Sequence, residues 1–238
     1  MKPSIVAAAV FLAGVGQAFA ADFPVPAPGA PTPPASYTPV LPPYTNWSGL
    51  YIGLNGGYDF GTANWNSTGN FSTSGGIIGG TIGLNFPYGP VIFGFEGDID
   101  WADANGSTSV AQCATAGGFA GSVCQIKIST IGTARARLGY SFDRALVFVS
   151  AGGAFGFVRG GDNPPAMYDS GFALGWAAGA GVEFALVENW TVKAEYLFLD
   201  LGNVTCSTAA HCGVAGAGAE IALTESIVRA GVNYKFSW

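Results

Sequence analysis

The end of the chain alternates apolar and polar residues with the two-residue period of a β-strand. One parity of the stretch Ser226–Trp238 carries Val228, Ala230, Val232, Tyr234, Phe236 and Trp238. The other parity carries Arg229, Gly231, Asn233, Lys235 and Ser237. One face of this strand is therefore apolar, and the other bears charge. A closed β-barrel in a lipid bilayer provides an environment for both faces.

Seven earlier stretches alternate in the same way. The predicted strands are Gly49–Phe60, Gly75–Phe86, Val91–Trp101, Gln125–Tyr140, Ala145–Phe157, Phe172–Phe184, Trp190–Leu201 and Ser226–Trp238. The connections alternate between long and short, the long ones being 61–74, 102–123, 158–171 and 202–223. Short turns on one side, longer loops on the other and an even strand count are typical of outer-membrane barrels. We therefore predict an all-β fold: a closed, antiparallel, eight-stranded, up-and-down transmembrane β-barrel with four longer external loops and short periplasmic turns.

Composition supports this prediction. Hydrophobic residues make up 49% of the chain and charged residues 10%, against about a quarter charged in soluble domains. Beyond the first residues, the nearest candidate for a helical span is Phe172–Val187, which glycines and Glu183 interrupt. A soluble β-sandwich also has short strands, but it would need neither aromatic residues on the outward face nor charges on the inward face.

Many charged residues share the parity that we assign to the barrel interior. They are Asp59, Glu96, Asp98, Lys127, Arg135, Arg137, Glu183, Lys193, Glu195, Glu225, Arg229 and Lys235. Side chains just fill the interior of an eight-stranded barrel, and an unpaired charge there would be costly, so we expect networks of arginine with carboxylate. This favours a structural polar core over a selective pore, without assigning pairs. The same parity sends Ile126 and Ile128 outward. The facing of Ala145–Phe157 is left open.

The first residues are typical of an export signal. Lys2 precedes the apolar run Ile5–Val15. A small-x-small cleavage site follows, formed by Ala18, Ala20 and the new amino-terminal Ala21. We predict a cleaved signal peptide over residues 1–20 and favour it over an uncleaved anchor. Residues 21–46 are rich in Pro and Ala, which predicts an extended periplasmic spacer, with a cell-wall tether as the alternative. The barrel domain is predicted over residues 47–238.

Four cysteines fall in two of the predicted external loops, Cys113 and Cys124 in the second and Cys206 and Cys212 in the fourth. An exported chain meets an oxidising compartment, so two local disulfides are the first choice among three possible connectivities. A metal site using His211 beside Cys212 is the weaker alternative, because CxxC spacing is lacking.

Other chemistry finds little support. Asp98, Asp100 and Asp103 could form a calcium-binding rim, but they lack the glycine and the glutamate of an EF-hand. The net charge of −6 argues against a nucleic-acid partner. His211 is the single histidine, and neither GxSxG nor GxGxxG occurs. We therefore expect no enzyme activity, no cofactor and no metal.

Several motifs together resemble a known family. They are Trp47–Gly53, Gly94–Asp98, Arg135–Tyr140, Gly175–Trp176, Gly179–Glu183 and Lys193–Leu197. The chain from Trp47 to Trp238 is similar to the small outer-membrane immunogenic proteins of alpha-proteobacteria, which are porin-like barrels distantly similar to the OmpA transmembrane domain. This resemblance implies an eight-stranded barrel in the outer membrane, inserted by the barrel-assembly machinery. The terminal residues Val232, Tyr234, Phe236 and Trp238 resemble the signal which that machinery recognises, with Trp where Phe is usual.

The resemblance also implies a function. Members of the family are mostly linked to envelope integrity and surface exposure, and some to haem binding, although the sequence carries no haem motif to match. We predict a structural, surface-exposed barrel that supports the envelope and contacts outer-membrane lipid and lipopolysaccharide, with a monomer favoured. The alternatives are a porin-like channel for small solutes and a barrel whose loops bind a ligand such as haem or a host surface.

Overall fold

The structure, a computed structural model, describes residues 46–65, 69–109, 121, 123–163, 167–187, 189–206 and 219–236. The predicted signal peptide, nearly all of the spacer and Trp238 lie outside these residues, so the predictions for them stay untested. The strands are β1 (Gly49–Trp65), β2 (Gly69–Tyr88), β3 (Val91–Ser107), β4 (Val123–Phe142), β5 (Ala145–Asn163), β6 (Met167–Val187), β7 (Trp190–Cys206) and β8 (Ala219–Phe236). Within the described part of the chain, no helix is long and apolar enough to cross a membrane.

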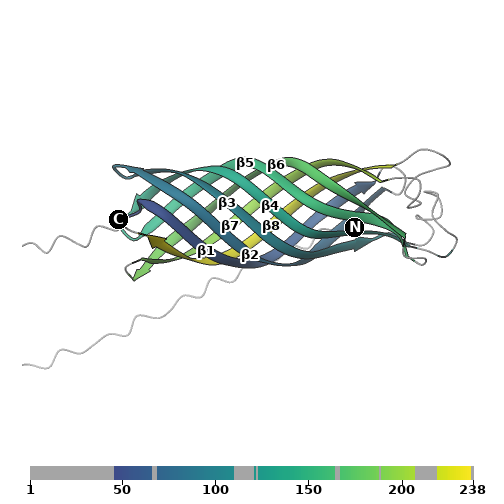
Figure 1. Ribbon diagram of the computed structural model, residues 1–238, viewed down its shortest axis with the longest axis horizontal. Coiled ribbons are helices and arrows are strands. Elements are labelled where there is room, and N and C mark those ends of the chain that lie inside the picture. Colours follow the sequence, from purple (N-terminus) through teal and green to yellow (C-terminus); the bar gives the residue numbers. More distant parts are fainter. Residues whose placement is uncertain are drawn as a thin grey trace, which may run out of the picture. The chain divides into compact units, whose positions relative to one another are not determined.

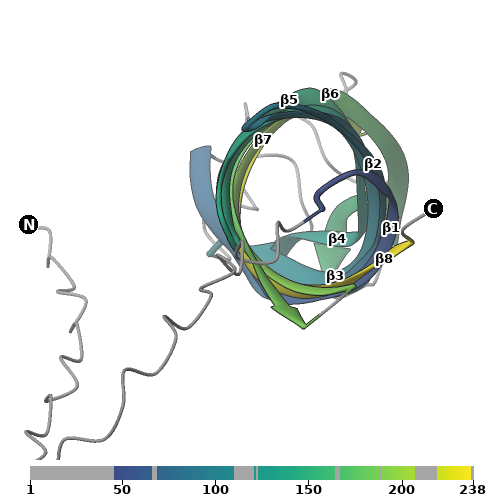
Figure 2. The ribbon, with the colours of Figure 1, turned by 90° about the vertical axis from the view of Figure 1, so that its left-hand side faces the viewer.

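Each strand pairs antiparallel with its neighbours in sequence, and β1 pairs with β8 to close the barrel (Figure 1). The closing register runs from Leu50↔Phe236 to Trp65↔Ile221. Viewed along its length, the sheet forms a ring with β1 beside β8 (Figure 2). Closure leaves no strand edge unpaired, and the eight-stranded, up-and-down barrel predicted from the sequence is confirmed.

Tight turns join the strands at the end of the barrel that we take as periplasmic. Gly89, with a positive φ of 62°, turns β2 into β3, and Asp143, with a φ of 54°, turns β4 into β5. The N–H of Ser141 donates to the carbonyl of Pro90 at 2.8 Å and ties these two turns together.

The strands are longer than the sequence predicted. The pairing of β1 with β2 continues to Trp65↔Gly69, through most of the predicted loop 61–74. Likewise β5 and β6 pair as far as Asp162↔Met167. The first and third outer connections are therefore short, which corrects the prediction of four longer loops. The alternation was missed because the outward residues at this level are polar, as Thr62 and Ser72 show.

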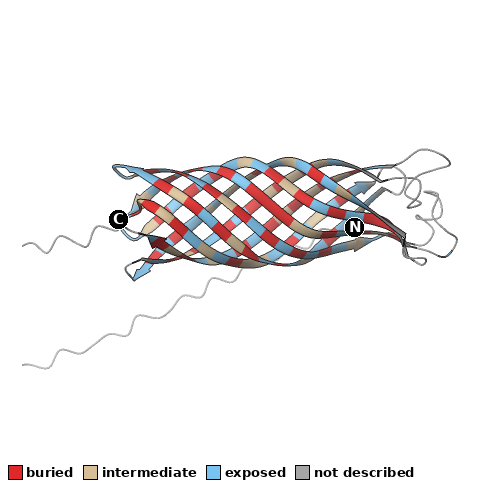
Figure 3. Ribbon diagram, in the orientation of Figure 1, coloured by how far each residue is buried: buried red, intermediate tan, exposed pale blue. Residues whose placement is uncertain are grey.

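Along the barrel, outward residues are exposed and inward residues are buried (Figure 3). The outward face is apolar from Val91 to Trp101 in β3 and from Trp190 to Phe198 in β7, close to the roughly 9–11 residues that a tilted strand needs to cross a bilayer. We call this part the membrane half. Toward the outer end of the barrel, the last outward-facing residues of the membrane half, one on each strand, are Phe60, Ile78, Trp101, Gly132, Phe157, Phe172, Phe198 and Val228. The strand residues beyond these positions form the outer half.

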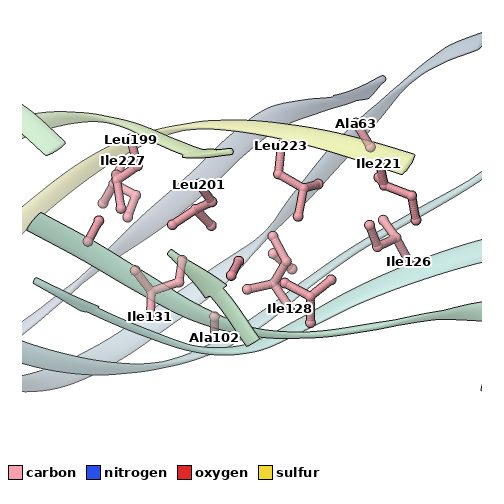
Figure 4. Packing of buried hydrophobic residues seen from close by; sticks show 14 of the residues in the cluster. Ala63, Ala102, Ile126, Ile128, Ile131, Leu199, Leu201, Ile221, Leu223 and Ile227 are labelled. Carbon is pink, nitrogen blue, oxygen red and sulfur yellow. The ribbon is translucent and has the colours of Figure 1, made fainter. Parts of the chain in front are cut away.

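The outer half has a conventional hydrophobic core. Its buried inward side chains come from strands around the whole ring and point toward one another (Figure 4). Those drawn and labelled include Ala63, Ala102, Ile126, Ile128, Leu201, Ile221 and Leu223. The outward residues at this level are polar, among them Asn64, Ser74, Asp103, Asn105 and Thr224. In the outer half, therefore, apolar side chains lie inside and polar side chains lie outside.

Candidate functional site

The interior of the membrane half is built on glycines that face large polar residues. On β1, inward positions occupied by glycine alternate with positions that carry a side chain. Three of these glycines lie directly opposite the long polar residues of β8, in the pairs Gly53↔Asn233, Gly57↔Arg229 and Gly61↔Glu225. A Cβ added to Gly57 would lie 2.7 Å from the Cβ of Arg229. The missing side chains therefore leave the room in which the charged groups cross the barrel.

Arg135 of β4 lies at the centre of a buried charge network. Its Nη2 donates to Asp98 at 2.7 Å and to Glu96 at 2.8 Å. Its Nη1 donates to Glu195 at 2.6 Å and to Ser150 at 2.8 Å. The charged groups of this arginine and of its three carboxylate partners have side-chain exposures of 0–1%. Arg135 thus joins β3, β5 and β7 across the lumen.

Arg229 of β8 completes the central network. Its Nε and Nη2 donate to the same oxygen of Glu195, at 3.0 and 2.8 Å. Its Nη1 donates to Asp98 at 3.0 Å and to Asp100 at 2.8 Å. Two arginines therefore share Asp98 and Glu195, and Lys193 is a third cationic partner of Glu195 at 3.6 Å. Such charge-assisted bonds are the strong ones in proteins.

A second tier lies nearer the periplasmic end, around Arg137. Its guanidinium lies 3.9 Å from the centre of the Phe148 ring, pairs with Glu183 and donates to the hydroxyl of Tyr51 at 3.1 Å. Tyr51 in turn donates to Glu96 at 2.6 Å. Glu96 therefore links this tier to the central network.

Other groups complete the coordination of the carboxylates. Lys193 donates to Glu96 at 2.7 Å. Glu183 accepts hydrogen bonds from Thr191 at 2.5 Å and from Asn233 at 3.1 Å. We call the whole set the charge network. Its members are Tyr51, Glu96, Asp98, Asp100, Thr133, Arg135, Arg137, Ser150, Glu183, Thr191, Lys193, Glu195, Arg229 and Asn233.

Two groups of charged residues lie in the lumen outside the charge network. At the periplasmic end, Lys235 donates to the carbonyl of Asn46 at 2.7 Å, and its ammonium lies 4.7 Å from the centre of the Trp47 ring. Toward the outer end, Glu225 accepts from the hydroxyl of Thr73 at 2.9 and 3.0 Å. The carboxyl of Asp59 lies beside that of Glu225. Lys235, Glu225 and Asp59 form no ion pair with another described residue.

The prediction that Lys127 faces the lumen is wrong. Its side chain is 54% exposed and pairs with Asp103 on the outer surface, at 3.0 Å. A β-bulge between Ile128 and Thr130 shifts the register of β4 against β5. The extra residue reverses the parity beyond it. Lys127 therefore points outward, and Ile128 is buried inside, contrary to the prediction.

The other predicted lumen charges are all buried: Asp59, Glu96, Asp98, Arg135, Arg137, Glu183, Lys193, Glu195, Glu225, Arg229 and Lys235. Strand β5, whose facing was left open, turns Leu146, Phe148 and Ser150 inward. Prediction missed Tyr51, Asp100 and the hydroxyl and amide partners of the carboxylates. Their inward parity was available as a signal, but neutral polar residues such as Tyr51 do not stand out in a sequence as charges do, and Asp100 was considered only for the calcium-binding rim.

The three aspartates considered as a calcium rim do not meet. Asp98 and Asp100 lie inside the barrel, and Asp103 lies outside. Among the described residues, no cluster of histidine, cysteine, aspartate or glutamate could hold a metal ion. Cys124 is buried in the core of the outer half and is not a free cysteine. Cys113, Cys212, His211 and the side chain of Cys206 lie outside the described set, so the disulfide pairing stays a prediction.

The predicted assembly signal forms part of an outward aromatic patch at the end of β8. Val232 and Phe236 are exposed on the outer face. The ring of Tyr234 lies 5.1 Å from the ring of Phe236 and 5.1 Å from that of Trp190 on β7. Rings gathered at the edge of the apolar stripe are typical of membrane interfaces.

The charge network fills the barrel from wall to wall. A water-filled pore through this level would expose its lining groups, but Arg135, Arg229, Asp98 and Glu195 have side-chain exposures of 0%. The apolar core of the outer half covers the network on one side. On the other side lies a smaller apolar cluster with Trp47 and Ile92. The arrangement is suited to holding the eight strands together.

A barrel with an apolar outward belt and a charged, filled interior is the architecture of an outer-membrane protein. The chain belongs to the outer membrane protein beta-barrel domain family, whose match covers residues 7–236. It is located in the bacterial outer membrane, as its relatives are named for that location.

Two named relatives are similar along their whole length. The 31 kDa outer-membrane immunogenic protein of Brucella melitensis is 34% identical, over 98% of this chain and 99% of the relative. The 25 kDa outer-membrane immunogenic protein of Brucella abortus is 29% identical, over 99% of both chains. The family resemblance predicted from the sequence is thereby confirmed. Among solved structures, OprG of Pseudomonas aeruginosa aligns with a TM-score of 0.50 at 10% identity, over 79% of this chain and 98% of that one, which supports the fold alone.

Proposed function

We propose that this protein is a structural, surface-exposed barrel with a sealed lumen, which supports the integrity of the outer membrane and contacts lipopolysaccharide. The observation that carries the proposal is the charge network. Side chains from seven of the eight strands, all except β2, meet in one connected set of buried hydrogen bonds and ion pairs.

A channel would have to break this network. Arg135 and Arg229 share Asp98 and Glu195, so displacing either arginine takes from both buried carboxylates one of their cationic partners, and displacing Arg229 also leaves Asp100 without one among the described residues. Breaking a buried ion pair typically costs about 3–5 kcal/mol. The network contains several such pairs, and the apolar core of the outer half would have to open as well. These terms support a structural role over a porin-like channel.

Conductance tests the sealed lumen directly. The mature protein would be refolded in detergent, checked for the heat-dependent gel mobility of a folded barrel, and reconstituted in planar bilayers beside a porin as a positive control. We expect no reproducible conductance steps. Stable steps of uniform size would contradict the sealed lumen and support the alternative, a channel for small solutes.

The envelope role is tested in the organism. Deleting the gene should raise sensitivity to detergent and bile salts, and expression of the intact protein should restore resistance. Unchanged permeability in the deletion strain would count against the proposal. We also expect no lipid-modifying activity, so labelled lipid A incubated with the folded protein should be recovered unchanged. Binding of haem or of a host surface by the loops stays an alternative that no described contact favours.

A further inference from the structure

Two basic residues of the chain lie on the outward face of the outer half. The sequence has 9 lysines and arginines. Lys2 lies in the predicted signal peptide, and Arg144 lies in a periplasmic turn. Five others are buried in the lumen: Arg135, Arg137, Lys193, Arg229 and Lys235. The remaining two, Lys127 and Arg159, both point outward in the outer half and are direct partners in the register of β4 and β5.

This cation pair lies just beyond the apolar belt. Arg159 occupies the outward position next to Phe157, whose ring lies 5.3 Å from that of Phe172. Between β3 and β5, the two cations line a surface cavity of about 320 Å³ together with Asn105, Ser107 and Gln125. The pair therefore lies where the hydrocarbon of the outer leaflet gives way to its headgroups.

Two grooves lie on the outward face of the membrane half, on the periplasmic side of Lys127 and Arg159. One groove of about 850 Å³ lies between Trp101 and Phe155 and crosses Gly80 and Gly97. A second groove of about 580 Å³ adjoins it at Gly97 and runs over Ala134 and Ala151. Small residues on four neighbouring strands, β2–β5, form the floors of the two grooves, and large aromatic residues flank them. Each groove is lined almost entirely by apolar surface, which suits a hydrocarbon chain.

We propose that the outer face of β2–β5 binds a phosphorylated acyl lipid of the outer leaflet, the lipid A part of lipopolysaccharide. A phosphate would contact Lys127 and Arg159, and acyl chains would lie in the two grooves. This inference rests on the lipopolysaccharide contact of the proposed function and assigns it to a site. Charge complementarity supports it, because lipid A carries phosphates at the level where the barrel carries these two outward cations.

Asp103 faces the site and does not block it. Asp103 is 76% exposed and pairs with Lys127 at 3.0 Å. An exposed pair of this kind contributes little energy, so a phosphate can share the ammonium of Lys127 while Asp103 orients it. The side chain of Arg159 has no hydrogen-bond or ion-pair partner among the described residues, which leaves its five N–H donors for a ligand.

Binding is tested on the full mature protein, refolded in detergent and titrated with purified bisphosphorylated lipid A. The variant Lys127→Gln/Arg159→Gln should bind about tenfold or more weakly, whereas Arg144→Gln, which removes a cation at the periplasmic end, should bind like the unmodified protein. Dephosphorylated lipid A should bind the unmodified protein as weakly as bisphosphorylated lipid A binds the double variant. Heat-dependent gel mobility confirms that each variant is folded.

A second pair of variants tests whether the grooves hold the acyl chains. Ala134→Leu fills the second groove and should weaken lipid A binding severalfold, whereas Ala230→Leu makes the same change on the outward face of β8, away from the site, and should not. Equal binding by the double variant and the unmodified protein would overturn the site while leaving the lipopolysaccharide contact intact. No binding of lipid A by the unmodified protein would overturn both.

Discussion

The two halves of this barrel arrange polar and apolar residues in opposite ways. In the membrane half, Ile99 and Trp101 point outward while Asp98 and Asp100 lie inside. A few residues further along the same strand, Asp103 points outward and Ala104 lies inside. The alternation of inward and outward residues along β3 continues without interruption, and what changes is the medium outside. Lipid surrounds the first region and water the second.

The comparison shows that alternation of residue types defines a strand. The surrounding medium, lipid or water, decides whether the outward or the inward residues are apolar. A barrel wall in lipid gains nothing from apolar side chains inside, so its interior is held by directional ion pairs. A barrel wall in water can bury isoleucine and leucine and gain the usual hydrophobic stabilisation. The same eight strands therefore carry two different cores.

The largest expected effect concerns the core of the membrane half. Arg229→Met should lower the free energy of unfolding by about 3–5 kcal/mol, because Asp98, Asp100 and Glu195 would lose a buried cation. Unfolding by urea in lipid vesicles measures this. Lys127→Met, which removes an exposed pair, is the control and should cost about 0–1 kcal/mol. Equal losses would show that the network does not hold the membrane half together.

Matched isoleucines separate the two cores. Ile128→Ala removes packing inside the outer half and should cost about 2–5 kcal/mol. Ile99→Ala makes the same change on the lipid-facing surface and should cost much less, because lipid chains fill the space that the side chain leaves. If both variants unfold at the same urea concentration, the outer half has no core of its own.

Arginine substitutions on the outward face locate the change of medium. Ile82→Arg places a charge against the hydrocarbon and should cost about 2–4 kcal/mol if it lies near the bilayer midplane. Ser72→Arg, on the same strand and face but in the outer half, should change stability by less than about 0.5 kcal/mol. A penalty at Ser72 similar to that at Ile82 would place the outer half within the membrane.

The smallest effect is expected where the two cores meet. Asp59 and Glu225 bring two carboxyl groups together without a cation from a described residue. The double variant Asp59→Asn/Glu225→Gln, which replaces both carboxyl groups with neutral amides, should therefore unfold at an unchanged or slightly higher urea concentration. A marked loss of stability would show that these carboxyl groups act as part of the charge network.

The sequence was sufficient for the strand count, the closed barrel and most of the inward charges, because outward apolar stripes and inward charges are regular in the membrane half. It failed where that regularity ends. Thr62, Asn64 and Ser72 suggested loops because an outward strand face was expected to be apolar. Lys127 was assigned to the wrong face because a single bulged residue, invisible in the pattern, reverses the parity of β4. The pairing of particular charges depends on barrel register, which no local pattern contains.

Spin-label accessibility along β3 tests the reversal most directly. A spin-labelled amino acid would be placed at Phe95, Ile99, Asp103 or Asn105, all of which point outward, in protein reconstituted in vesicles. We predict that oxygen, which concentrates in lipid, relaxes the labels at positions 95 and 99, and that a water-soluble nickel complex relaxes those at 103 and 105. Lipid-type accessibility at all four positions, or water-type accessibility at all four, would contradict the account of two oppositely ordered halves.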